Sequence, residues 1–264
     1  MPVEGDFRMF VDTGDIIGSS LATRRVWEPH VTPLVLGLLS EGQVFVDVGA
    51  HVGYYALMAS KIVGPTGLVY ALEPSSANRA LLEANVRRSG ASNVRLLAIA
   101  AGAEPGGGVL RTPPGADAAR MSLSVGDAAE GDPVAILPLA DIVDDGDAVR
   151  LSLVKIDVEG YEDRVLQGLE PLLSRGARPT ILLELHAHLN PEVGEPVADF
   201  CRRNGMTPHL IGDDEGFNRR FALPKADVTR AVTPDWIVTS LVEHHELLLV
   251  PEEAVLHEVL TGSH

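Results

Sequence analysis

From residue 44 onward the chain alternates short apolar runs with amphipathic segments, and this alternation limits the fold more than any other feature. The first run, 44–48, is apolar except for Asp47 and lacks the hydrophobic–polar alternation of a half-exposed strand. Such apolar strands are typical of parallel sheets that helices cover on both faces. Strand and helix alternating at this spacing predict a doubly wound, mostly parallel α/β sheet.

The other expected elements continue this order. Helices are expected over 31–39, 52–62, 77–89, 139–144, 161–173 and 195–204, and strands over 44–48, 68–72, 94–100, 134–138, 151–157, 180–186, 206–211 and 236–241. Right-handed crossovers bring the carboxyl ends of parallel strands to one edge, where ligands bind.

The rest of the chain is expected to cover that edge. Residues 1–30 look irregular, and residues 102–133, rich in Gly, Pro, Ala and Asp, are expected to form a loop or a pair of short edge strands. We therefore divide the 264 residues into an N-terminal lid segment, 1–40, and one domain, 41–264.

The charge and the composition limit which classes of binding partner the protein can have. The formal net charge is −16, from 37 acidic against 21 basic residues, so phosphate backbones are repelled and nucleic acid is not an expected partner. The one cysteine, Cys201, excludes an intrachain disulfide and a cysteine zinc cluster. The first ten residues do not resemble a secretory signal, and no apolar run reaches membrane-spanning length, so we expect a cytoplasmic protein, with a homodimer allowed.

The first chemical motif joins the first strand to the next helix. Residues 46–53, VDVGAHVG, place Gly49 where the chain must turn sharply and Gly53 where the helix must pack closely on the sheet. Dinucleotide enzymes carry G-x-G-x-x-G, whereas this chain has D-x-G-x-x-x-G. The pattern favours a cofactor without a pyrophosphate, and Asp47 can attract an ammonium group. The alternative is a tight turn without a ligand.

Glu73 ends the second strand, 20 residues after Gly53. A carboxylate at this place can accept hydrogen bonds from both hydroxyls of a ribose. The alternative is that Glu73 caps the helix that follows Pro74. The preceding glycine motif favours the ribose role.

Charged residues also interrupt two later apolar strands. Lys155, Asp157 and Glu159 alternate along one side of a strand end, where unpaired buried charges are costly. A structural pair between Lys155 and Asp157 is the alternative to a role in the site.

On the next strand, Glu184, His186 and His188 share one face, and a histidine is the natural base near neutral pH. A metal held by Asp157, Glu184 and His186 is the alternative that we do not favour.

Together these segments resemble the FkbM-type S-adenosylmethionine-dependent methyltransferases from about residue 24 to about residue 190. The most specific pieces are FVDVGAHVGYYALMASKIVGPTGLVYALEPSSANRALLEANV and LVKIDVEGYEDRVLQGL; Trp27-Glu28-Pro29 and the MSLS stretch, Met121 to Ser124, resemble further family elements. The resemblance implies a Rossmann-like class I methyltransferase fold and O-methylation of a small molecule, often a sugar or an antibiotic-type metabolite. The sequence differs from the family pattern at His51, where the family often has asparagine. Residues 191–264 match nothing specific.

Motifs and resemblance together select the candidate site. For S-adenosylmethionine, the expected residues are Glu28, Asp47, Gly49, Ala50, His51, Gly53, Glu73, Pro74, Ser122 and Asp157. For catalysis, we expect His186 to remove the proton of the acceptor hydroxyl, with Asp157 or Glu159 orienting it.

Three other functions were weighed against this one. N-methylation of a small molecule or peptide is the nearest alternative. A nicotinamide-dependent oxidoreductase is disfavoured because the G-x-G-x-x-G motif and a Tyr-x-x-x-Lys pair are missing. A non-catalytic nucleotide-binding module would not need three charged residues at one strand end.

Overall fold

The computed structural model describes residues 2–3, 7–111, 122–125, 131–212, 229–240 and 244–252. Its main sheet has eight strands in the order β13-β12-β14-β11-β10-β3-β4-β5. The five strands from β11 to β5 are parallel, which confirms the predicted doubly wound, mostly parallel fold. They are β3 (Val44–Val48), β4 (Leu68–Leu72), β5 (Val94–Leu97), β10 (Leu151–Ile156) and β11 (Thr180–His186).

The other side of the sheet is antiparallel. β14 (His244–Pro251) lies between β11 and β12 (Met206–Ile211), and β13 (Thr229–Ala231) pairs with β12 at the edge. The strand expected over 236–241 is wrong for 236–240, which belong to helix α9 (Pro234–Ser240), and residue 241 lies outside the described residues. A proline at the first position and the Thr233 hydroxyl, which accepts a hydrogen bond from the backbone N–H of Trp236 at 3.2 Å, favour a helix start there.

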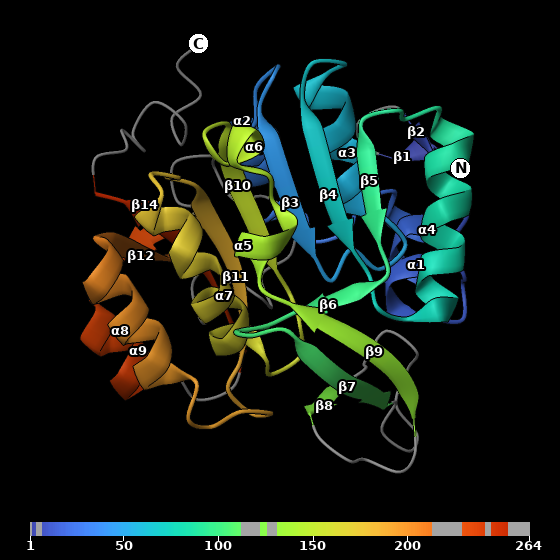
Figure 1. Cartoon of the computed structure of the whole chain (residues 1–264). Helices are drawn as coiled ribbons and strands as arrows, with labels where there is room; N and C mark the ends of the chain where they lie inside the picture. The colour runs from blue at the N-terminus through green and yellow to red at the C-terminus, as the bar shows by residue number, and fades with distance from the viewer. Residues whose placement is uncertain are drawn as a thin grey trace.

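Helices cover both faces of the sheet (Figure 1). One apolar core includes Leu166 of α7 and Phe200 of α8, and the other includes Leu34 of α2 and Leu57 of α3. All five residues of β3, Asp47 included, are buried, as the lack of hydrophobic–polar alternation in this run predicted. The helices are α1 (Ile16–Arg24), α2 (Thr32–Leu38), α3 (Tyr54–Val63), α4 (Ser76–Ser89), α5 (Leu139–Ile142), α6 (Asp145–Ala148), α7 (Glu162–Ser174) and α8 (Gly194–Asn204), besides α9. Among the helices of the described residues, none has the length and apolar character that crossing a membrane requires.

A second, four-stranded sheet has the order β6-β9-β7-β8 and lies at the end of the main sheet to which the arrows of β3 and β4 point (Figure 1). The run 94–100, expected as one strand, is divided: β5 pairs with β4, and β6 (Ile99–Ala101) pairs with β9 (Asp132–Leu137). The expected edge strands are β7 (Gly106–Arg111) and β8 (Ser122–Val125), while 112–121 and 126–130 lie outside the described residues.

The N-terminal part is more regular than the sequence suggested. The two-residue strands β1 (Pro2–Val3) and β2 (Phe7–Arg8) pair with each other, and α1 follows them. The irregular assignment of 16–24 is wrong because its capping signal went unrecognised: the Asp15 side chain accepts a hydrogen bond from the backbone N–H of Gly18. Leu21 of α1 is fully buried, so packing overrides the weak helix propensity of Gly and Ser in this helix.

Candidate functional site

A cavity of about 800 Å³ lies at the carboxyl ends of the parallel strands. Residues just after β3, β4, β10 and β11 form its floor, and α1 with residues 27–30 forms one wall. Leu110 and Leu123 of the second sheet also line it. The position is the one that strand topology predicts for a ligand site.

The glycine turn after β3 brings the backbone to the cavity wall. Gly49 has φ +84°, and a Cβ there would lie 2.0 Å from the carbonyl oxygen of Asp157. Gly53 has φ +90°, and a Cβ there would lie 2.4 Å from Cδ1 of Leu82. The first glycine therefore allows the sharp turn with β3 and β10 ending side by side, whereas the second allows close packing of α3 against α4, and not against the sheet as the motif predicted.

Glu73 lies at the end of β4 and is 5% exposed. Its Oε2 accepts a hydrogen bond from the backbone N–H of His51 at 2.8 Å, and its Oε1 accepts one from the backbone N–H of Ser75 at 2.9 Å. Burial raises the pKa of Glu73 to about 7, against the lowering effect of these hydrogen bonds. The N-cap of α4 is Ser75, so the carboxylate of Glu73 is not explained as a helix cap.

Asp47 lies beneath the turn and does not line the cavity. It is buried, and its Oδ2 has no hydrogen-bond partner among the described residues. Burial raises the pKa of Asp47 to about 6, although Lys155 and the backbone N–H of Ala56 lower it. The predicted contact between Asp47 and an ammonium group stays a prediction.

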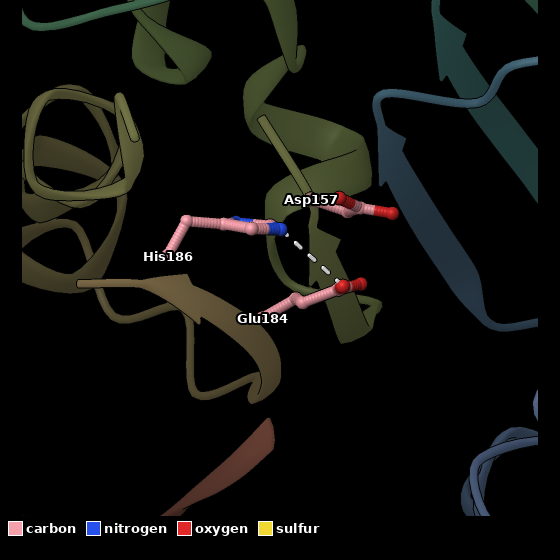
Figure 2. Close-up of side chains that lie close together, drawn as sticks. All are labelled: Asp157, Glu184 and His186. Carbon is pink, nitrogen blue, oxygen red and sulfur yellow. Dashed lines mark ion pairs between the residues drawn. The ribbon is translucent and has the colours of Figure 1, made fainter. Parts of the chain in front are cut away.

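The charged strand ends meet at one place. Asp157 follows β10, Glu184 and His186 belong to β11, and Figure 2 shows the three side chains pointing toward one another. Nε2 of His186 is 3.4 Å from Oε1 of Glu184 and 3.8 Å from Oε2 of Glu159. One donor atom from each of Asp157, Glu184 and His186 lies within 4.8 Å of the other two, which is the set named for the metal alternative.

His186 is surrounded by carboxylates. Its Nδ1 lies 2.7 Å from Oε1 of Glu162, the first residue of α7. Burial alone would lower the pKa of His186, but the hydrogen bonds to Glu162 and Glu184 and the charges of Glu184 and Asp157 raise it to about 11. The ring is therefore charged at neutral pH, and it must lose that proton before it can act as a base.

Lys155 and Asp157 form the pair that the sequence offered as an alternative to a site role. Nζ of Lys155 is 3.0 Å from Oδ2 of Asp157. Asp157 also lines the cavity, so the pair and the site coexist. Burial and the charge of Glu184 raise the pKa of Asp157 to about 7, while Lys155 and His186 lower it.

Glu28 reaches the same part of the cavity from the N-terminal segment. Its Oε2 accepts a hydrogen bond from the hydroxyl of Tyr55 at 2.7 Å. Glu28, His51 and Glu159 are non-glycine residues with positive φ, of 42°, 49° and 50°, and all three line the cavity. Strained backbone of this kind is concentrated at functional sites.

The structure places most of the predicted cofactor residues on the cavity wall. Glu28, Gly49, His51, Glu73, Pro74 and Asp157 line it, whereas Asp47, Ala50 and Gly53 support the turn from behind. The backbone of Ser122 is in β8, and its side chain lies outside the described part of the structure.

Sequence reasoning missed four residues near the carboxylates: His30, Tyr55, Glu162 and Glu246. Nε2 of His30 is 2.5 Å from Oε2 of Glu246, and both residues line the cavity. Glu246 belongs to β14, whose position the sequence did not predict. For Glu162 a signal existed, because it closes the KIDVEGYE motif.

The doubly wound sheet defines a Rossmann-like fold, and its glycine turn and buried glutamate line a cavity at the carboxyl ends of the strands. Residues 47–229 match the methyltransferase FkbM domain, so the chain belongs to the FkbM methyltransferase family and is an S-adenosylmethionine-dependent methyltransferase by family and fold.

Solved structures with a similar fold are distant in sequence. A precorrin-6y C5,15-methyltransferase from Geobacter metallireducens is 15% identical, with 85% of this chain and 88% of that chain covered and a TM-score of 0.47. A SAM-dependent methyltransferase from Aquifex aeolicus is 16% identical, with 88% and 93% covered and a TM-score of 0.45. A SAM-dependent O-methyltransferase from Thermotoga maritima is 12% identical, with 90% and 72% covered and a TM-score of 0.44.

Proposed function

We propose that this protein transfers the methyl group of S-adenosylmethionine to a hydroxyl of a small polar molecule such as a sugar or an antibiotic-type metabolite. The observation that carries the proposal is one continuous cavity with two different ends. Glu73 lies at the end formed by β4, and Asp157, Glu184 and His186 lie at the end formed by β10 and β11. A nucleoside site and a group of acid–base side chains therefore face the same space.

The residues present fit the cofactor. Gly49 lines the cavity with main-chain atoms, and Glu73, which also lines it, offers carboxylate oxygens to a pair of hydroxyls. Glu28, Gly49, His51, Glu73, Pro74 and Asp157 would hold it. When bound, S-adenosylmethionine supplies a methyl group already activated on a sulfonium.

The protein's own chemistry is positioning and proton removal. Cavity residues would hold the acceptor oxygen near the cofactor, and such positioning supplies much of the rate enhancement. The acceptor oxygen would take the methyl group, and its proton would pass to a side chain at the carboxylate end. Asp157 is our first candidate for this step because it lines the cavity, and because the surrounding carboxylates raise the pKa of the competing base, His186. His186 and Glu159 then orient the acceptor.

The rival way to activate the hydroxyl is a divalent cation at Asp157, Glu184 and His186, which would acidify it. We do not favour it because positive charge already reaches these carboxylates. Lys155 contacts Asp157 at 3.0 Å, and the His186 ring contacts Glu184 at 3.4 Å.

The test is a methyl-transfer screen. The protein is incubated with S-adenosylmethionine carrying a ¹³C-labelled methyl group and with panels of sugars, amino sugars and hydroxylated lactones, and S-adenosylhomocysteine formation is followed. NMR of the product assigns the methyl to oxygen or nitrogen. Transfer to oxygen that is lost in Asp157→Asn supports the proposal, and transfer to nitrogen throughout would contradict it.

A further inference from the structure

Glu162 is a fully buried carboxylate that the proposed reaction does not yet use. It is 0% exposed at the start of α7, and its Oε1 lies 2.7 Å from Nδ1 of His186. The same oxygen accepts a hydrogen bond from the backbone N–H of Gly160 at 2.9 Å. Its other oxygen, Oε2, has no hydrogen-bond partner among the described residues.

Helix stabilisation does not explain this burial. An acidic residue in the first turn favours a helix, but Asp163 occupies the same turn and can supply that effect. A buried carboxylate is costly unless a partner compensates its charge. For Glu162 the compensating partner is the imidazole of His186, which is itself only 5% exposed.

The contact determines which ring nitrogen faces the cavity. With Nδ1 held by Glu162, Nε2 faces Glu184 at 3.4 Å and Glu159 at 3.8 Å. A flipped ring would break the short contact with Glu162. The other titratable neighbours of the ring are Asp157, whose charge acts on it, and His188, whose ring centroid lies 5.8 Å away.

We propose that Glu162 is a positioning residue that fixes the ring of His186, with Nδ1–H toward α7 and Nε2 toward the acceptor side of the cavity. Through Nε2, His186 then holds the acceptor oxygen beside Asp157. In general, a buried carboxylate that accepts a hydrogen bond from one ring nitrogen of a histidine fixes the orientation of the other nitrogen. The effect on turnover rests on the proposed function, whereas the ring orientation does not.

The experiment uses the full-length protein labelled with ¹⁵N at histidine. The His186 signals are assigned as those missing in His186→Gln. In the wild type we expect a downfield, slowly exchanging Nδ1 proton at neutral pH. Glu162→Gln keeps the shape but removes the charge, so this proton should move upfield and exchange faster. Asp163→Asn, a change in the same helical turn without the histidine contact, should leave it unchanged.

Turnover gives the second readout, with an acceptor found in the methyl-transfer screen. Glu162→Gln should lower kcat at least about 10-fold, with less effect on KM and none on S-adenosylhomocysteine affinity. Glu162→Asp keeps the charge and should recover part of the loss.

Two results would overturn the proposal. One is a wild type without a hydrogen-bonded Nδ1 proton at His186, which tests the contact even if Glu162→Gln does not fold. The other is a folded Glu162→Gln whose Nδ1 proton and kcat match the wild type. Failure of the methyl-transfer screen itself would instead contradict the proposed function and leave the NMR result standing.

Discussion

The backbone N–H of His51 donates a hydrogen bond to Oε2 of Glu73 over 2.8 Å, and this bond ties the glycine turn after β3 to the end of β4. The two motifs that selected the cofactor thus form one unit. Because His51 has a positive φ of 49°, the bond also helps to hold a strained turn in place.

The first prediction concerns cofactor binding at Glu73. Glu73→Ala removes a buried acceptor and strands the N–H groups of His51 and Ser75, so S-adenosylhomocysteine binding should weaken by about 1–3 kcal/mol. Titration calorimetry measures this. Glu83→Ala, on the exposed side of helix α4, which follows Glu73, is the matched control and should bind normally. Equal affinities for wild type and Glu73→Ala would remove Glu73 from the site.

The second prediction concerns stability and pH in the ligand-free protein. The pKa of Glu73 rises from 4.5 to about 7 on folding, so the folded state holds this proton more tightly than the unfolded state. The contribution of Glu73 to the free energy of unfolding is therefore full below pH 4.5 and is lost as pH rises to about 7. In Glu73→Gln the free energy of unfolding should decline less between pH 4.5 and about 7 than in the wild type. Urea titrations at several pH values would measure this difference. Parallel curves for both proteins would contradict the prediction.

The third prediction concerns the pH dependence of turnover. If Asp157 accepts the proton, it must be ionised, and its pKa is about 7. Turnover should rise with pH through about 7 and level off above it. His186, with a pKa of about 11, stays charged across this range and adds no inflection near 6.5. Asp157→Asn should lower kcat by about 10²–10⁴-fold. An inflection near 6.5 that disappears in His186→Gln would restore His186 as the base.

The fourth prediction separates proton acceptance from metal assistance. EDTA should leave wild-type turnover unchanged, because side chains remove the proton. His186→Ala should lower turnover by about 10²-fold, because the acceptor loses an orienting contact, while S-adenosylhomocysteine affinity stays nearly constant. Activity that is lost on chelation and returns with Mn²⁺ or Mg²⁺ would instead assign Asp157, Glu184 and His186 to a metal.

The fifth prediction concerns the cover of the cavity. Residues 16–30 form one wall, so amides in α1 and in residues 27–30 should exchange more slowly when S-adenosylhomocysteine is bound. Hydrogen exchange with and without this ligand is the measurement. Strand β3, buried throughout, serves as the internal reference. Equal exchange of residues 16–30 in both states would argue against a lid.

The sequence by itself determined the parallel part of the fold and the position of the glycine turn and Glu73 at the carboxyl ends of its strands. Apolar runs such as 44–48 can only be buried on both faces, and a glycine turn between strand and helix is a local feature. Gly49 and Glu73 were therefore found without coordinates.

Only the tertiary structure decided the rest, because it depends on contacts between residues far apart in the chain. β14 enters the sheet beside β11 from the far end of the chain, and Glu246 meets His30 across more than two hundred residues. The charge of His186 depends likewise on Glu162, 24 residues away and on another element. A histidine in a sequence carries its ordinary pKa near 6.5, and only packing among carboxylates in the folded protein raises the pKa of His186 above that value.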